Sequence, residues 1–248
     1  MNNVYIYDSY LSQKSHQKAL AAMEIRLTDL GLNGKIYRLT PMTRLSEIIR
    51  DELKRKAKTI VAVGGDSLFS KLATLLSGTD TPLAILPIGE KSACAKTLGI
   101  TEDDPCKVLA ARRIVNLDTG KIDAGQFFLC EALIKTEDSL IRLNRDIEIT
   151  VKGQAEIKVV NILPKDDIEN TLSANPEDGK FNIFITVKDS GGFLKKSVSK
   201  SFFLCESLEI ENGVKEVLID SSIKLDKASR IDIVPKAIFV IVGKERSF

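Results

Sequence analysis

The stretch "TIVAVGGDSLFSKLATLLSG", residues 59–78, carries the sequence signal that decides the fold. It opens with an apolar run typical of a strand covered on both faces. The run ends in Gly64, Gly65 and Asp66, and leucines at three- and four-residue spacing then predict a helix that closes near Gly78. Such a junction can bind phosphate, because glycine permits positive φ and the first-turn N–H groups of a helix favour an anion. Tight strand–helix turns without a ligand have the same pattern, so both interpretations stay open here.

The segments around this junction repeat its alternation of strand and helix. "NVYIY" (3–7), "KIYRLT" (35–40) and "PLAILP" (82–87) have the character of strands. Between them, leucines, isoleucines and a methionine recur at helical spacing over residues 20–30 and 45–53. We therefore expect an α/β domain with a parallel sheet, right-handed crossovers and helices on both faces, which is a three-layer arrangement of the nucleotide-binding type.

The pattern changes after about residue 118. Period-two segments such as "IEITV" (147–151) and "KFNIFITVK" (180–188) follow, separated by turn residues such as Asn212-Gly213. This predicts an antiparallel β-sandwich. The expected domains are thus 1–118 (α/β) and 119–236 (β-sandwich), with a cleft between them. The closing apolar strand, within 237–248, is a candidate to pack back onto the first domain.

Composition excludes several classes of function. The net charge of +2 gives no reason to expect a nucleic-acid partner, and the basic cluster "KRKAK" (54–58) favours a helix end, with at most peripheral contact to an anionic membrane. Four scattered cysteines without a C-x-x-C pair indicate buried small apolar residues. The single histidine, His16, argues against multi-histidine metal sites. No secretory signal or membrane-spanning run is visible, so we expect a cytoplasmic protein.

An ordered series of motifs adds a family resemblance. After "GGD", the segment "PIGEKSACAKTLG" (87–99) has Pro87, Gly89 and a leucine-glycine end, and "KIDAGQFFLCEALI" (121–134), "NPEDGKFNIFI" (175–185) and "LIDSSIKLDKASRIDIVPKAIFVIV" (218–242) follow. In this order they resemble the G-G-D-G-T, P-x-G-T-x-N-D-F-A, D-x-G, D-G-x-L and D-G-E motifs of the diacylglycerol kinase and bacterial lipid kinase family. The resemblance covers nearly the whole chain.

The resemblance implies a nucleotide site, a magnesium ion and a substrate. Family members transfer the γ-phosphoryl group of ATP to a lipid hydroxyl, and a homodimer is a reasonable expectation from the same likeness. The positions that it implies around ATP are Thr40, Gly64, Gly65, Asp66, Ser67, Leu68, Gly89 and Glu90. A structural Mg²⁺ would be held by the Asp178 carboxylate, with Asn175 and Lys180 at carbonyl positions, although "EDG" is equally well explained as a turn.

The sequence departs from the family pattern where the chemistry takes place. Ser67 replaces a glycine, Leu68 replaces a threonine, and Glu90 places a carboxylate where a threonine would lie near the phosphates. Burial of the helix stripe explains Leu68 without a ligand. "YDSYLSQKS" (7–15) stands where an N-P-x-S-G-like phosphate turn is expected and lacks its proline and glycine.

The general base is the last departure. Ser222 stands where the family has the glutamate of the D-G-E turn, and a serine cannot accept a proton at neutral pH without a base behind it. Asp220 could substitute, or could simply end a strand.

Three hypotheses follow. The chain is a divergent lipid kinase that uses Mg-ATP and Asp220 or a water-bridged base. Alternatively, it is a catalytically degenerate relative that binds nucleotide or lipid, or acts through protein partners. The third, an NAD kinase, shares the G-G-D turn but carries an asparagine-rich signature that is not apparent here.

Overall fold

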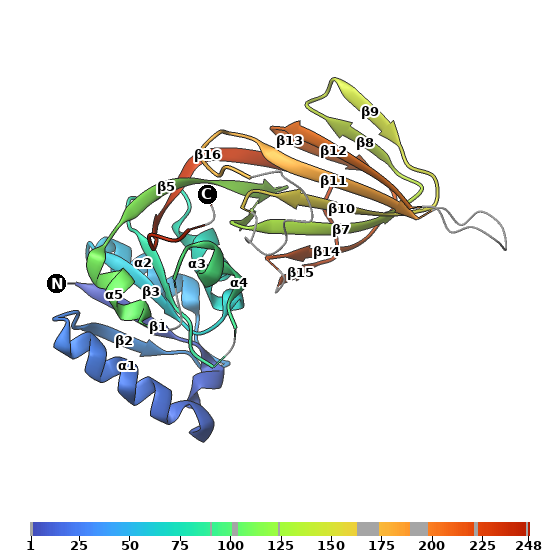
Figure 1. The fold of residues 1–248 in the computed structure, drawn as a ribbon. Helices are drawn as coiled ribbons and strands as arrows, with labels where there is room; N and C mark the ends of the chain where they lie inside the picture. The colour runs from blue at the N-terminus through green and yellow to red at the C-terminus, as the bar shows by residue number, and fades with distance from the viewer. Residues whose placement is uncertain are drawn as a thin grey trace. The chain divides into compact units, whose positions relative to one another are not determined.

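The structure, a computed structural model, describes residues 2–89, 91–100, 104–123, 125–162, 174–188, 198–220, 223–246 and 248. Its helical segments are η1 (Ser9–Ser12), η2 (Lys14–His16), α1 (Gln17–Asp29), α2 (Leu45–Lys54), α3 (Asp66–Leu76), α4 (Ala93–Thr97) and α5 (Pro105–Ala111) (Figure 1). The strands are β1 (Asn3–Tyr7), β2 (Gly34–Arg38), β3 (Thr59–Val63), β4 (Leu83–Leu86), β5 (Ile114–Ile122), β6 (Gln126–Phe128), β7 (Glu131–Glu137), β8 (Leu140–Leu143), β9 (Ile147–Thr150), β10 (Gln154–Val160), β11 (Phe181–Lys188), β12 (Val198–Cys205), β13 (Ser207–Glu211), β14 (Val214–Ile219), β15 (Ile223–Leu225) and β16 (Arg230–Ile241).

The chain divides into two compact units. Unit 1 consists of residues 1–117 and 237–247, and unit 2 consists of residues 118–236 and 248. Two strands, β5 and β16, run across the division, so each contributes residues to both units.

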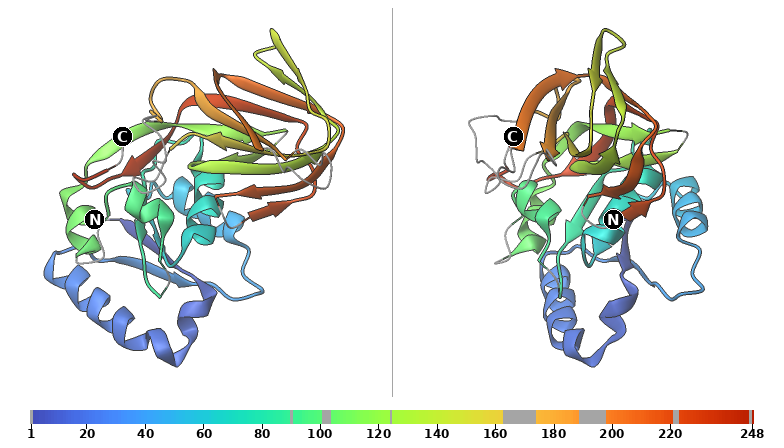
Figure 2. Two further views of the ribbon diagram at one scale, coloured as in Figure 1. Left: turned by 45° about the vertical axis from the view of Figure 1, so that its right-hand side comes forward. Right: turned by 90° about the vertical axis from the view of Figure 1, so that its right-hand side faces the viewer.

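Unit 1 contains the parallel sheet that the alternating pattern predicts. Its strands follow the order β2-β1-β3-β4, every pair is parallel, and β16 joins β4 in parallel through Val240 and Leu83. Tyr5 and Tyr7 of β1 pack in one cluster with residues of α1 and α5. The right-hand view of Figure 2 shows α2 on the opposite side of the sheet from α1 and α5. The three-layer α/β prediction is therefore confirmed.

Unit 2 is an antiparallel β-sandwich, as predicted. One sheet has the order β12-β11-β10-β7-β14-β15, and β16, β13, β8 and β9 are hydrogen-bonded in that order in the other. One apolar cluster joins them, with Ile134, Ile157 and Val217 from the first sheet and Leu143 and Ile231 from the second. The alternation of these residues along each strand is what identified the sandwich in the sequence.

The four cysteines are free and buried, which confirms that they serve as small apolar residues. Among the described residues, no helix is long and apolar enough to cross a bilayer.

A buried carboxylate, that of Glu52, connects α2 to β2. Glu52 is 1% exposed, and it accepts hydrogen bonds from Lys35 Nζ at 2.8 Å, from the Tyr37 hydroxyl at 2.6 Å and from Arg55 at 2.7 Å. Burial alone raises the pKa of Glu52, but hydrogen bonds from Lys35, Tyr37 and Arg55 together outweigh it and hold the pKa below its ordinary value of 4.5. The ionised form of Glu52 therefore stabilises the fold.

We predict that Glu52→Gln lowers the free energy of unfolding at neutral pH by about 2 kcal/mol, because it leaves charged donors without their anion. The difference from the wild type should shrink as the pH falls through and below 4.5, since the wild-type carboxyl then takes up a proton as well. Urea denaturation at several pH values measures it. Glu47→Gln, on the same helix but in an exposed pair with Arg44, is the control and should change stability by less than about 0.5 kcal/mol. Equal losses in the two variants at neutral pH would refute the assignment.

Candidate nucleotide site

The predicted glycines Gly64, Gly65 and Gly89 follow strands β3 and β4 at the carboxyl edge of the parallel sheet in unit 1. Because β1 is flanked by β2 on one side and β3 on the other, the strand order reverses between β1 and β3. Ligands of open α/β sheets bind outside the carboxyl ends of the strands at such a reversal. Asp8 directly follows β1 and Gly64 directly follows β3, so both stand at this point. The Asp8 amide donates to the Val63 carbonyl at 3.0 Å, which fixes the two strand ends side by side.

Two of the predicted glycines have backbone conformations that favour glycine. Gly64 has φ +144° and Gly89 has φ +86°, conformations that side-chain-bearing residues rarely adopt. The Gly64 amide donates to the Leu86 carbonyl at 3.1 Å, which joins the turn to the end of β4. The first-turn N–H groups of α3 have no partner within that helix, as at the start of any helix.

Side chains from the segment after β1 cover both glycine positions. A Cβ built on Gly64 would lie 2.8 Å from Asp8 Cβ, 3.4 Å from the Tyr10 hydroxyl oxygen and 3.6 Å from Asp8 Oδ2. A Cβ built on Gly89 would lie 2.7 Å from His16 Cε1 and 3.1 Å from Tyr10 Cε2. A phosphate that approached Gly64 from this side would therefore meet the Asp8 carboxylate, which repels it.

Tyr10 and His16 are held in this position. The Tyr10 hydroxyl donates to the Ile88 carbonyl at 2.6 Å, and the Tyr10 and His16 rings meet edge to face with centroids 5.4 Å apart. We name Asp8, Tyr10 and His16 the glycine cover. Sequence reasoning did not assign these residues to the site. The sequence signal for these residues is that residues 7–15 lack the proline and glycine of the expected phosphate turn. Without a tight turn around a phosphate, the side chains of this segment can lie beside the two glycines.

Asp66 does not cap its own helix. The N-cap of α3 is Gly65, and Asp66 is the first helical residue. Its carboxylate instead accepts hydrogen bonds at the start of α4, from the Ser92 hydroxyl, from the Ala93 amide at 2.9 Å and from the Cys94 amide at 3.4 Å. Asp66 thus connects the glycine turn to the segment that follows Gly89.

The remaining predicted nucleotide residues are divided between core and surface. Leu68 is 2% exposed, which confirms that it belongs to the buried stripe of α3. Ser67 is half-buried beside it. Thr40 is exposed after β2, and its amide donates to the Thr43 hydroxyl oxygen at 2.9 Å. Glu90 lies outside the described residues.

Asp220, the predicted substitute base, lies in unit 2 and holds a turn together. It follows β14 with φ +44° and is 3% exposed. Its carboxylate accepts backbone N–H groups of Leu129 at 3.2 Å, Cys130 at 2.8 Å and Glu131 at 3.0 Å. These contacts occupy both oxygens that a general base would offer to a substrate hydroxyl, so the geometry favours a structural role. Ser222 lies outside the described residues, and catalysis by either residue stays a prediction.

The predicted magnesium residues form a self-contained turn in unit 2. Asn175 Oδ1 accepts the Glu177 amide at 3.1 Å, Asp178 Oδ1 accepts the Lys180 amide at 2.9 Å, and the Asn175 carbonyl accepts the Asp178 amide at 3.4 Å. Asp178 is exposed, and the described part of the chain holds no group of three or more acidic, histidine or cysteine side chains able to share an ion. The donor set therefore fits a hydrogen-bonded turn, and magnesium binding by these residues stays a prediction.

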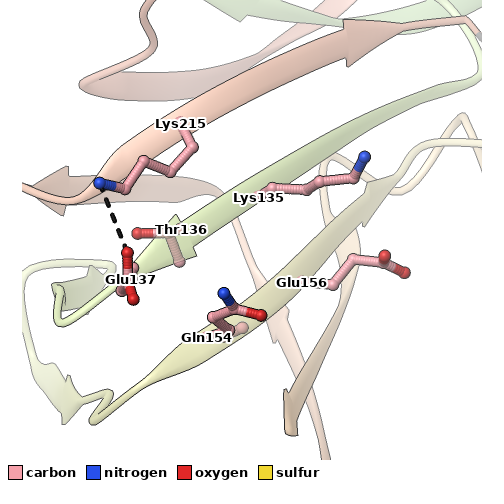
Figure 3. Close-up of a pocket in the computed structure, with 7 residues that line it drawn as sticks. Lys135, Thr136, Glu137, Gln154, Glu156 and Lys215 are labelled. Atoms are coloured by element: carbon pink, nitrogen blue, oxygen red, sulfur yellow. Dashed lines mark ion pairs between the residues drawn. The ribbon is translucent and has the colours of Figure 1, made fainter.

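Unit 2 also has a hollow of about 210 Å³ that none of the predicted residues lines. Figure 3 shows charged and polar side chains of β7, β10 and β14 around it, with Lys215 paired to Glu137 at 3.4 Å. Thr136 is 2% exposed, and its hydroxyl has no hydrogen-bond partner among the described residues.

Comparison with known proteins places the chain in a family. Residues 4–127 match the model of the diacylglycerol kinase catalytic domain, so the chain belongs to the diacylglycerol kinase catalytic domain family. A crystal structure of a diacylglycerol kinase from Bacillus anthracis is similar over 99% of this chain and 98% of its own, with a TM-score of 0.74 and 18% identity.

Two further structures from the same organism, described provisionally as diacylglycerol kinases, have TM-scores of 0.75 and 17% identity. They cover 99% and 98% of this chain, and it covers 98% of each. No curated protein matches the sequence. At this identity the structural likeness establishes the shared fold.

We predict that Asp66→Ala lowers the free energy of unfolding by about 1–2 kcal/mol, because the Ser92 hydroxyl and the Ala93 and Cys94 amides lose their acceptor. Amide hydrogen exchange should rise at Ala93 and Cys94, the two residues whose amides Asp66 accepts. Asp80→Ala, at an exposed position after the same helix, is the control. Unchanged exchange at both amides would contradict the assignment.

We further predict that Asp220→Ala destabilises the protein by about 3 kcal/mol, since buried amides lose their acceptor and each unmade bond costs about 1–3 kcal/mol. Asp226→Ala, at an exposed position beyond β15, should change stability by less than about 0.5 kcal/mol. Chemical denaturation of the two variants compares them. If the losses are similar, the carboxylate of Asp220 does not support the turn.

Proposed function

We propose that this protein is a member of the diacylglycerol kinase catalytic domain family that acts by binding and does not transfer phosphate from ATP. The observation that carries the proposal is the Asp8 carboxylate beside Gly64, at the place where the fold would present its backbone to a phosphate. The glycine cover excludes the triphosphate both by charge and by volume, since Tyr10 and His16 occupy the space beside Gly89.

The use of the carboxylates supports the same conclusion. Asp66 and Asp220 accept backbone amides at 2.8–3.4 Å, and each stabilises a local turn or helix start. A kinase needs a group that accepts the proton of the substrate hydroxyl, and groups that stabilise the phosphoryl group during its transfer. Both side chains are engaged with backbone amides, which supports structural roles for them. Binding of a lipid or a protein partner in the cytoplasm remains the proposed way in which the chain acts.

A divergent kinase is the second candidate, and the positive φ of Gly64 and Gly89 favours it. In that case ATP, with Mg²⁺, would give its γ-phosphoryl group to a lipid-type hydroxyl. The acceptor oxygen would form a bond to the γ-phosphorus, the bond to the bridging oxygen would break and release ADP, and Asp220 or a water would take the hydroxyl proton. The glycine cover would then have to leave the turn before ATP binds.

Calorimetric titration with ATP, with and without Mg²⁺, separates the two candidates. We predict no saturable heat for the wild-type protein up to millimolar ATP, and no phosphate transfer from radiolabelled ATP to a short-chain diacylglycerol. Asp8→Asn should raise ATP affinity by at least about ten-fold, because it removes a like charge from the phosphate position. Asp29→Asn, on the exposed face of α1, is the matched control and should have no effect.

Adding Ser67→Gly and Leu68→Thr to Asp8→Asn should increase the affinity further, since these changes restore the family residues in the turn. Micromolar ATP binding by the wild type that is lost in Asp66→Ala, together with turnover, would overturn the proposal in favour of the kinase. A thermal melt of each variant verifies that the fold survives.

A further inference from the structure

Unit 1 has a large open hollow at the amino edge of its parallel sheet, the edge opposite the glycine turns. Its volume is about 740 Å³. It is formed by the chain after α2, the loop between α3 and β4, the end of α5, the start of β5 and one residue of β16. The proposed function does not use this surface. The residues that line the hollow lie at the opposite ends of the strands from Asp8 and Gly64.

Cations dominate one side of this hollow. Lys56, Lys58 and Arg112 line it, against a single acidic residue, Asp80. Lys56 and Lys58 are exposed and form no ion pair with any residue that the structure describes. The guanidinium of Arg112 is fixed, because it donates to the Thr59 hydroxyl at 2.5 Å and to the Lys58 carbonyl at 3.0 Å.

The end of α2 does not account for all of this charge. Cations near the carboxyl end of a helix balance its partial negative charge, and Lys54 and Arg55 stand there, with Arg55 also paired to Glu52 at 2.7 Å. Lys56 and Lys58 lie beyond that helix end. Part of the basic cluster of residues 54–58 therefore serves the helix, and the remainder faces the hollow.

Apolar residues also line the hollow. Leu53, Ile114 and Phe239 line it, and Ile114 is 39% exposed although it is a large aliphatic residue. Thr79 and Thr81 line it as well, and their hydroxyl groups donate to the Leu76 and Ala57 carbonyls, so their oxygens serve as acceptors. Fixed and free cations together with exposed apolar side chains in one hollow match a molecule that has a phosphate group and an uncharged part beside it.

We propose that this hollow binds the phosphate group of an anionic ligand through Lys56, Lys58 and Arg112, and that Ile114 and Phe239 contact the uncharged part of the same molecule. The source of the phosphate is a lipid headgroup or a soluble phosphate compound. Lysine and arginine recognise both in the same way, and salt screens both interactions.

The test uses the full chain and two probes. Sedimentation with vesicles of phosphatidylcholine that contain phosphatidic acid detects a lipid headgroup, and calorimetry with inorganic phosphate detects a soluble ion. Vesicles of phosphatidylcholine alone are the blank. Saturable binding to the phosphatidic acid vesicles alone assigns the site to a lipid, and saturable binding of inorganic phosphate assigns it to a soluble compound. Binding to neither probe would overturn the proposal.

The double variant Lys56→Gln, Lys58→Gln should weaken the observed binding by about thirty-fold, since each basic residue near an anionic surface contributes about five-fold. The control, Lys18→Gln with Lys71→Gln, removes the same charge from exposed positions on α1 and α3 and should retain the affinity. Equal losses of affinity in the two double variants would mean that only the net charge of the protein matters, and would refute the site. The test of the proposed function uses ATP and variants at Asp8 and Asp66, and neither residue lines this hollow, so failure here is distinguishable from failure of the proposed function.

Discussion

The hydrogen bond between the Asp8 amide and the Val63 carbonyl, 3.0 Å long, is the constraint that fixes the carboxyl edge of the sheet in unit 1. It continues the parallel pairing of β1 and β3 by one residue beyond both strands. The Asp8 side chain is thereby placed beside Gly64, and the following residues bring Tyr10 and His16 to Gly89. A conserved feature of parallel sheets, the alignment of their carboxyl edges, thus puts an acidic group where this architecture elsewhere admits a phosphate.

Acidic side chains in this fold are used repeatedly to hold the backbone. Asp66 accepts amides at the start of α4, Asp220 accepts those of residues 129–131, and Asp118, which is 1% exposed, accepts the Gly179 amide at 2.8 Å and the Lys236 amide at 2.7 Å. Backbone donors around a carboxylate fix its orientation and consume its lone pairs. A residue type that a family motif associates with catalysis can therefore be retained for structural reasons alone.

Local patterns predicted the architecture well, and contacts distant in sequence limited the prediction of the site. The leucine spacing of α3 is enough to place Leu68 in the core, and alternation along the later strands is enough to identify the sandwich. The partners of Asp220, by contrast, lie 89–91 residues away, and the amides that Asp66 accepts lie 27–28 residues away. Such pairings depend on strand order and loop path, which periodicity does not specify.

The two edges of the sheet in unit 1 differ in charge, and this difference decides where an anion is stabilised. At the carboxyl edge, the helix start and glycine turn favour an anion, but Asp8 stands in its place. At the amino edge, helix ends disfavour an anion, and Lys56, Lys58 and Arg112 more than offset that effect because a full charge exceeds the partial charge of a helix terminus. The same sheet therefore has an acidic side chain beside the glycine turn at one edge and a basic hollow at the other, and the basic hollow is the edge that favours an anion.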